Sequence, residues 1–182
     1  SKDYICVALD MDDVNEAYRL AEILEDKVWG YKINSLFSRN QKSAMDLRGY
    51  GHLFIDMKIH DIPETAAAHA RAQLAWGADI INCHAEGGVE MMKAIRNEVD
   101  DNENSIVLAV TVLTSINQEM CIDIYGNPDI QNKVLQFAVM ALDDALLDGT
   151  VCSPNEVSEI KKRWGKNCVS VTPGIRLPGD DP

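Results

Sequence analysis

The sequence predicts a TIM (β/α)8 barrel whose eighth strand is missing from the chain, and three observations support this prediction. Short apolar runs alternate with helical patterns over the 182 residues, about 25 residues apart along the first five runs. Polar residues stand at the ends of several of these runs. No G-x-G-x-x-G motif follows the first run, although such a motif is typical of the alternative fold, an open doubly wound sheet.

Seven short apolar runs are predicted as parallel strands because a helical pattern or a turn separates each run from the next. The third run continues into a dense cluster of acids and bases. The predicted strands cover residues 4–9, 28–33, 53–55 with this polar continuation, 79–85, 106–113, 149–152 and 168–171. A barrel of this kind is typically about 250 residues long, so the length predicts that one strand–helix unit is missing.

Helices are predicted between these strands. Apolar residues recur at helical spacing from Val14 to Leu24. Pro63 suits the first turn of a helix, where its missing N–H removes no hydrogen bond, and Ser153 opens a capping-box pattern with proline at the next position. The predicted helices lie near residues 14–24, 41–48, 63–76, 87–96, 132–147 and from 154 onward.

Asp56, Lys58 and Asp61 form a D-x-K-x-x-D cluster at the end of the third predicted strand. Strand alternation sends Asp56 and Lys58 to the same face, and Asp61 falls in the following turn. One interpretation is a solvated loop with incidental charges. The other is an electrostatic device, because charges at a buried strand end cost several kcal/mol unless they pair.

Polar side chains at the ends of several strands favour a barrel over an open sheet, since these ends converge on one mouth in a TIM barrel, whereas an open sheet concentrates its site at one switch point. In chain order, the residues at predicted strand ends are Asp10, Lys32, Asp56, Lys58, His84, Thr114 and Arg176.

Composition predicts a single domain over residues 1–182 and excludes several classes of partner. The net charge of −12, from 17 basic and 29 acidic residues, argues against nucleic acid or an anionic membrane. The five cysteines form no C-x-x-C pair, so we expect reduced thiols in the core. No signal peptide or apolar span of 18 residues is present, which predicts a cytoplasmic protein.

Several motifs resemble the orotidine 5'-monophosphate decarboxylase family, in the order typical of that family and over nearly the whole chain. The block from Asp56 to Thr65, which adds Ile62-Pro63-x-Thr65 to the acid–base cluster, is the most specific. The other matching segments are Ala8-Leu9-Asp10, Tyr31-Lys32, Leu113-Thr114-Ser115, the stretch from Leu147 to Pro154, and Val171-Thr172-Pro173-Gly174-Ile175-Arg176.

The resemblance implies decarboxylation of orotidine 5'-monophosphate (OMP) to uridine 5'-monophosphate (UMP) in pyrimidine biosynthesis, with no metal and no organic cofactor. Lys58 is implied as the proton donor to C6 of the base. Asp56, Lys32 and Asp61 are implied to complete a catalytic array of alternating charge.

The resemblance also implies a homodimer in which Asp61 reaches the active site of the second subunit. It further implies a set of residues that bind the nucleotide substrate: Asp10, Lys32, Asp56, Ile62, Thr65, Thr114, Pro173 and Arg176.

Two alternatives remain open at this point. A sugar-phosphate lyase or aldolase of the same suprafamily, often Mg²⁺-dependent, shares the acid–base cluster, but Ile62-Pro63 counts against it. A non-catalytic nucleotide-binding barrel is the other alternative, and the intact charged set counts against it because unneeded buried charges are costly. We expect the phosphate-binding strand and the closing loop of the family to lie beyond Pro182.

Overall fold

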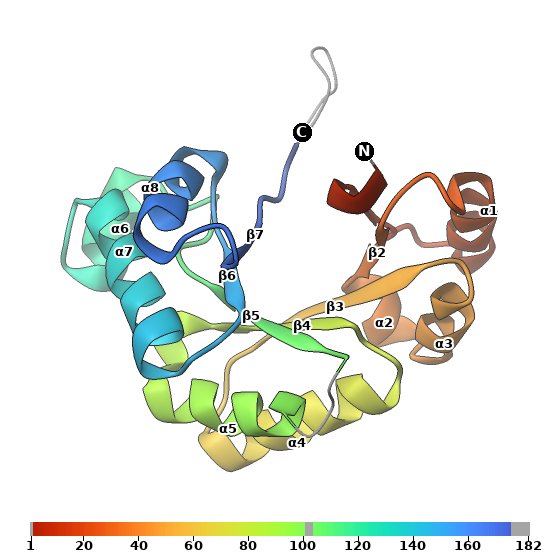
Figure 1. Cartoon of the computed structure of the whole chain (residues 1–182), viewed down its shortest axis with the longest axis horizontal. Coiled ribbons are helices and arrows are strands. Elements are labelled where there is room, and N and C mark those ends of the chain that lie inside the picture. The colour runs from red at the N-terminus through yellow and green to blue at the C-terminus, as the bar shows by residue number, and fades with distance from the viewer. Residues whose placement is uncertain (1, 101–103, 176–182) are drawn as a thin grey trace.

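The computed structural model describes residues 2–100 and 104–175, and within these ranges seven strands form one parallel sheet. The strands follow one another across the sheet in chain order (Figure 1). They are β1 (Cys6–Ala8), β2 (Gly30–Ile33), β3 (His52–Ile59), β4 (Ile80–His84), β5 (Ile106–Val110), β6 (Gly149–Val151) and β7 (Val169–Val171). The sheet curls into a half-barrel, as expected for a TIM-barrel chain.

Helices connect the strands and pack around the outer side of the curved sheet (Figure 1). They are α1 (Val14–Leu24), α2 (Ser35–Arg39), α3 (Lys42–Arg48), α4 (Pro63–Ala75), α5 (Val89–Asp100), α6 (Gln118–Tyr125), α7 (Ile130–Val139) and α8 (Pro154–Trp164), with short turns η1 (Lys2–Tyr4), η2 (Ala85–Gly87) and the π-helical η3 (Met140–Asp144). The seven predicted strands and the six predicted helices are therefore confirmed. The sequence prediction missed α2 and α6.

The predicted strand over residues 106–113 is too long at its end. Val110 pairs with Val151 as the last register pair between β5 and β6, and Val151 is also the last residue of β6. The Thr111 N–H still donates to the Val151 carbonyl at 3.2 Å, but the chain then turns away from the sheet and Leu113 is exposed.

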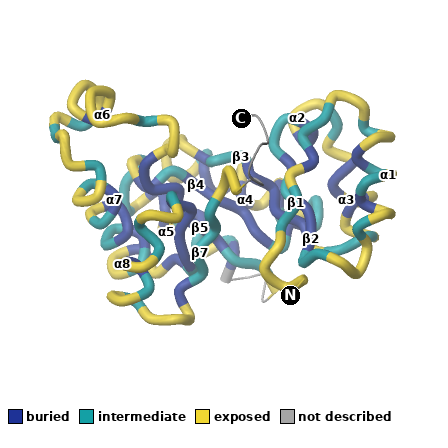
Figure 2. Tube along the Cα trace, turned by 90° about the horizontal axis from the view of Figure 1, so that it is seen from above, coloured by how far each residue is buried: buried dark blue, intermediate teal, exposed yellow. Residues whose placement is uncertain are grey.

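The sheet separates two apolar layers because successive side chains in a strand point to opposite faces. The larger layer lies between the outer face and the helices and includes Tyr31, Leu53, Ile55 and Ile81. The smaller layer fills the inner face with Phe54, Ile80, Leu108, Val110 and Val151. Figure 2 shows that the buried positions follow the strands and the inward sides of the helices.

The strands at the two edges of the sheet, β1 and β7, are only partly buried, whereas β2 to β5 are mostly buried. Within the described ranges β1 and β7 do not pair with each other. No helix of the described chain is both long and apolar enough to cross a membrane.

Candidate active site

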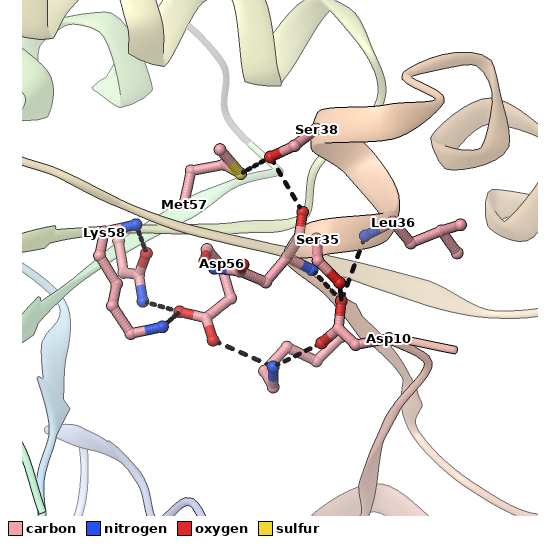
Figure 3. A network of polar contacts seen from close by, with 10 residues as sticks. Asp10, Ser35, Leu36, Ser38, Asp56, Met57 and Lys58 are labelled. Atoms are coloured by element: carbon pink, nitrogen blue, oxygen red, sulfur yellow. Dashed lines mark hydrogen bonds and ion pairs between the residues drawn. The ribbon is translucent and has the colours of Figure 1, made fainter. Parts of the chain in front are cut away.

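The predicted acids and bases gather at the carboxyl ends of the first three strands. Asp10 follows β1, Lys32 lies in β2, and Asp56 and Lys58 lie in the second half of β3. Figure 3 shows Asp10, Asp56 and Lys58 within one network of polar contacts. The expectation that strand ends bring distant residues together is confirmed for these four side chains.

Four side chains form a chain of ion pairs with alternating sign, called the charge array below. Lys58 Nζ lies 2.8 Å from Asp56 Oδ1, and Lys32 Nζ lies 3.0 Å from Asp56 Oδ2. Lys32 Nζ also lies 3.4 Å from Asp10 Oδ2. The formal charges sum to zero, which limits the free energy needed to bury them. The Asp56 side chain is only 9% exposed, and that of Lys58 is 31% exposed.

An irregularity in the sheet places Lys58 against Asp56. Ile55 pairs with Ile81, but the next register pair joins Ile59 to Cys83. Three residues of β3 therefore lie opposite Asn82 alone, which makes a bulge. Within it Lys58 adopts φ = 50°, in the left-handed region that costs a non-glycine residue about 1 to 2 kcal/mol. Residues held in this region cluster at functional sites.

Asp10 is fixed by the loop that follows β2. Its Oδ1 accepts hydrogen bonds from the backbone N–H of Asn34 (2.7 Å) and Leu36 (3.4 Å), and from the hydroxyl of Ser35 (3.4 Å). Figure 3 shows Ser35 and Leu36 beside this carboxylate. These donors orient Asp10 and leave its second oxygen to Lys32.

Burial and pairing act in opposite directions on the pKa values of Asp10 and Lys32, two neighbouring members of the array. Burial disfavours the charged form of Asp10, but the Asn34 N–H and the Lys32 ammonium outweigh it, so the pKa of Asp10 is lowered. Burial also disfavours the charged form of Lys32, but Asp56 and Asp10 outweigh it and raise the pKa of Lys32. Both groups are therefore ionised at neutral pH.

Two neighbours of the array are neutral at that pH. Burial raises the pKa of the Cys6 thiol in β1 to about 12. Burial also lowers the pKa of His84 at the end of β4, although Glu86 opposes that shift. Neither side chain adds a charge beside Asp56.

Two asparagines that the sequence interpretation did not select hold the centre of the array. The Asn82 amide donates to Asp56 Oδ1 at 2.6 Å, and the Asn34 amide donates to the backbone carbonyl of Asp56. The sequence could have predicted that Asn82 holds another polar group, because it is a polar residue inside the apolar run of β4 and buried polar groups are hydrogen-bonded. No comparable signal marks Asn34, which lies in a loop.

Within the described residues, Asp61 makes no hydrogen bond or ion pair with the charge array of its own chain, although it lines the same pocket as Lys58. Asp61 and Ile62 are exposed and Thr65 is half-buried, all at the start of α4. In the described part of the chain, Asp61 has one recorded contact, with its Oδ1 accepting the N–H of Ile62 at 2.7 Å. Whether Asp61 joins an active site in a second subunit stays a prediction.

A pocket of about 430 Å³ opens beside Asp61, between α2, the end of β3 and α4. Its lining includes Phe37, Met57, His60 and Gln73. Gln73 is only 4% exposed, yet its Oε1 has no hydrogen-bond partner within the described residues. A buried acceptor of this kind usually has a donor.

The remaining predicted substrate contacts lie farther along the sheet. Thr114 is exposed in the turn after β5, and Pro173 is exposed in the segment after β7. Arg176 lies outside the described residues. The described ranges contain no cluster of three or more histidine, cysteine, aspartate or glutamate side chains that could hold a metal ion.

Comparison with known proteins identifies the family. The model of the "Orotidine 5'-phosphate decarboxylase / HUMPS family" matches residues 3–182. The chain belongs to this family. The resemblance found in the motifs is thereby confirmed.

Relatives and solved structures agree with this assignment. Orotidine 5'-phosphate decarboxylase of Moorella thermoacetica is 35% identical over all of this chain and 75% of its own length. The enzyme of that name from Streptococcus agalactiae serotype Ia is 43% identical over 94% of this chain and 75% of its own length. The crystal structure of the Lactobacillus acidophilus enzyme superposes with a TM-score of 0.84 at 30% identity, covering 94% of this chain and 81% of that one.

Proposed function

We propose that this protein decarboxylates OMP to UMP, and that it does so without a metal or an organic cofactor. The observation that carries the proposal is the placement of Asp56 between the ammonium groups of Lys32 and Lys58 at the end of β3. The names of the relatives supply the substrate.

The chemistry explains why such a charge array is useful. Loss of CO2 breaks the bond between C6 and the carboxylate and leaves the electron pair on C6, an sp² carbon with no adjacent carbonyl to accept it. Fixed charges can favour this transition state over the substrate. The Lys58 ammonium stabilises the developing carbanion and gives its proton to C6, and solvent then returns a proton to the amine.

Asp56 has two roles in this proposal. It orients Lys58 through the 2.8 Å contact. It also lies beside the substrate carboxylate, so that the repulsion between two anions is relieved when CO2 leaves. Asp10 and Lys32, joined to each other and anchored by the loop after β2, bind the ribose hydroxyls. Ile62, Thr65, Thr114, Pro173 and Arg176 complete the substrate contacts.

We also propose that the protein is a homodimer in which Asp61 enters the site of the partner subunit. Two observations support this arrangement: Asp61 is exposed, and within the described residues it forms no ion pair with the lysines of its own chain.

The activity is tested with OMP labelled with ¹³C in its carboxyl group. We expect equal amounts of labelled CO2 and UMP. Cleavage that released a sugar-phosphate fragment, or no turnover by the full-length protein, would contradict the proposed reaction.

The shared site is tested by mixing inactive Lys58→Ala and Asp61→Ala proteins. In each mixed dimer one site lacks both groups and the other is intact. After full exchange of equal amounts, half the dimers are mixed and half of their sites work, so about a quarter of wild-type activity returns. If mass labelling demonstrates exchange and no activity returns, Asp61 does not act across the interface.

A further inference from the structure

We propose that Asn82 is a positioning residue that fixes the catalytic pair Asp56 and Lys58. Its carboxamide holds the Asp56 carboxylate and the left-handed backbone of Lys58 at the same time. This inference rests on the proposed function, because it assigns Asn82 a role in the same reaction without contact with the substrate.

The geometry of Asn82 uses both ends of its amide. The Nδ2 group donates to Asp56 Oδ1 at 2.6 Å, and Oδ1 accepts the backbone N–H of Lys58 at 2.8 Å. The Lys58 ammonium reaches the same oxygen of Asp56. Asn82, Asp56 and Lys58 therefore form a closed ring of contacts.

The position of Asn82 in the sheet explains why a side chain is needed there. Regular pairing between β3 and β4 stops after Ile55 and resumes at Ile59. The Lys58 N–H lies inside this bulge and donates its hydrogen bond to a side chain of β4, the Oδ1 of Asn82. That bond stabilises φ = 50° at Lys58, a conformation that persists only where its surroundings enforce it.

Burial argues against a substrate contact for Asn82, since the residue is 0% exposed. Its effect on catalysis therefore passes through Asp56 and Lys58. Misplacing a catalytic group by about 1 Å can cost about 10²-fold in rate. A positioning residue should thus change kcat far more than KM.

The test compares Asn82→Leu, which removes both hydrogen bonds at similar size, with Cys83→Ala. Cys83 is the next residue of β4, is equally buried and belongs to the outer core. We expect Asn82→Leu to lower kcat by about 10²-fold with KM changed less than about threefold. Cys83→Ala should leave both near wild type at a temperature where it is folded.

A second readout needs no substrate. Hydrogen exchange at the Lys58 amide, followed by NMR, should be at least about tenfold faster in Asn82→Leu than in wild type. The Leu53 amide is the internal control, because it donates to Asp79 at the other end of β3. Its exchange should change little.

The outcomes separate this proposal from the proposed function. If Lys58 and Leu53 amides respond equally, or if kcat falls no further than in Cys83→Ala, the positioning role is overturned even in an active decarboxylase. If wild type does not turn over OMP, the reaction is wrong, and the amide exchange still decides whether Asn82 holds Lys58. Should Asn82→Leu fail to fold, Asn82→Ala also removes both hydrogen bonds without adding a charge and must show the same kcat loss.

Discussion

The two ends of the sheet both contain nearly buried carboxylates, but the carboxylates have different partners. At the amino end, Asp79 is 11% exposed and its Oδ2 accepts the backbone N–H of Leu53 at the start of β3. Asp148 likewise accepts the N–H of Val107 in β5 and pairs with Arg96. At the carboxyl end, the Asp56 carboxylate is held by side chains alone, namely Lys32, Lys58 and Asn82.

This difference fits the proposal that Asp79 and Asp148 stabilise the fold and that Asp56 acts in catalysis. An acid that caps a strand N–H satisfies a backbone donor that would otherwise be left unpaired at the start of the ladder. An acid held by lysine side chains, by contrast, leaves no backbone donor unpaired if those contacts change when a substrate binds. The comparison agrees with the general pattern that the carboxyl-terminal face of such barrels carries catalysis and the other face carries stability.

The largest expected effect is that of Lys58→Ala at the carboxyl end. We expect kcat to fall by more than about 10⁴-fold, since both a proton donor and a stabilising charge are lost. A variant that kept a tenth of wild-type turnover in a steady-state assay would remove Lys58 from its proposed role.

Asp148→Asn at the amino end should lower the stability of the protein and leave kcat unchanged. Weakening the contacts to Val107 and Arg96 should cost about 1 to 3 kcal/mol of unfolding free energy. For a chain of this size that lowers the melting temperature by about 2 to 12 °C. Calorimetry checks the stability, and kcat at a temperature where the variant is folded should match wild type. A large loss of kcat at that temperature would contradict the proposal that the amino end of the sheet serves stability and the carboxyl end serves catalysis.

A smaller effect concerns the pH dependence of stability at Asp10. Because pairing and hydrogen bonds lower the pKa of Asp10 in the folded protein, its stabilisation is present above the ordinary value of about 3.9. The stabilisation is lost as pH falls through the lower folded value. Urea unfolding of Asp10→Asn should therefore lose less stability than wild type over that acidic window. Equal losses of unfolding free energy in the two proteins would mean that ionised Asp10 does not contribute to the pH dependence of stability.

The smallest expected effect is that of chelation. Exhaustive EDTA treatment should leave decarboxylation unchanged, because ammonium groups occupy both carboxylate oxygens of Asp56 and supply the positive charge that Mg²⁺ would otherwise provide. Loss of activity with EDTA and its return with Mg²⁺ would favour the sugar-phosphate lyase interpretation.

The sequence predicted the fold well because strand spacing and helix boundaries depend on local patterns. The limits of α1 match the prediction, and Ser153 caps α8 as expected. Helix α6 was also predictable, since Asn117 caps its start and Gly126 ends it in the left-handed conformation. Helix α2 was not, because it is short and has no side-chain hydrogen bond at its N-cap.

The centre of the site was predictable only in part. Asp56 and Lys58 share a face by alternation, and Lys32 was placed at the neighbouring strand end. The bulge that brings Lys58 Nζ to Asp56 depends on Asn82 of the next strand, and no pattern within β3 predicts it. The role of Asp61 stays a prediction for a similar reason, because it depends on a second chain.

The central claim, that the two ends of the sheet divide catalysis and stability, is tested most directly by Asp56→Asn and Asp79→Asn measured side by side. Each change replaces a nearly buried carboxylate in the same sheet by an amide of equal size. We predict that Asp56→Asn lowers kcat for OMP at least about 10²-fold and that Asp79→Asn mainly lowers the melting temperature. Equal losses of kcat in the two variants, compared at a temperature where both are folded, would contradict the account.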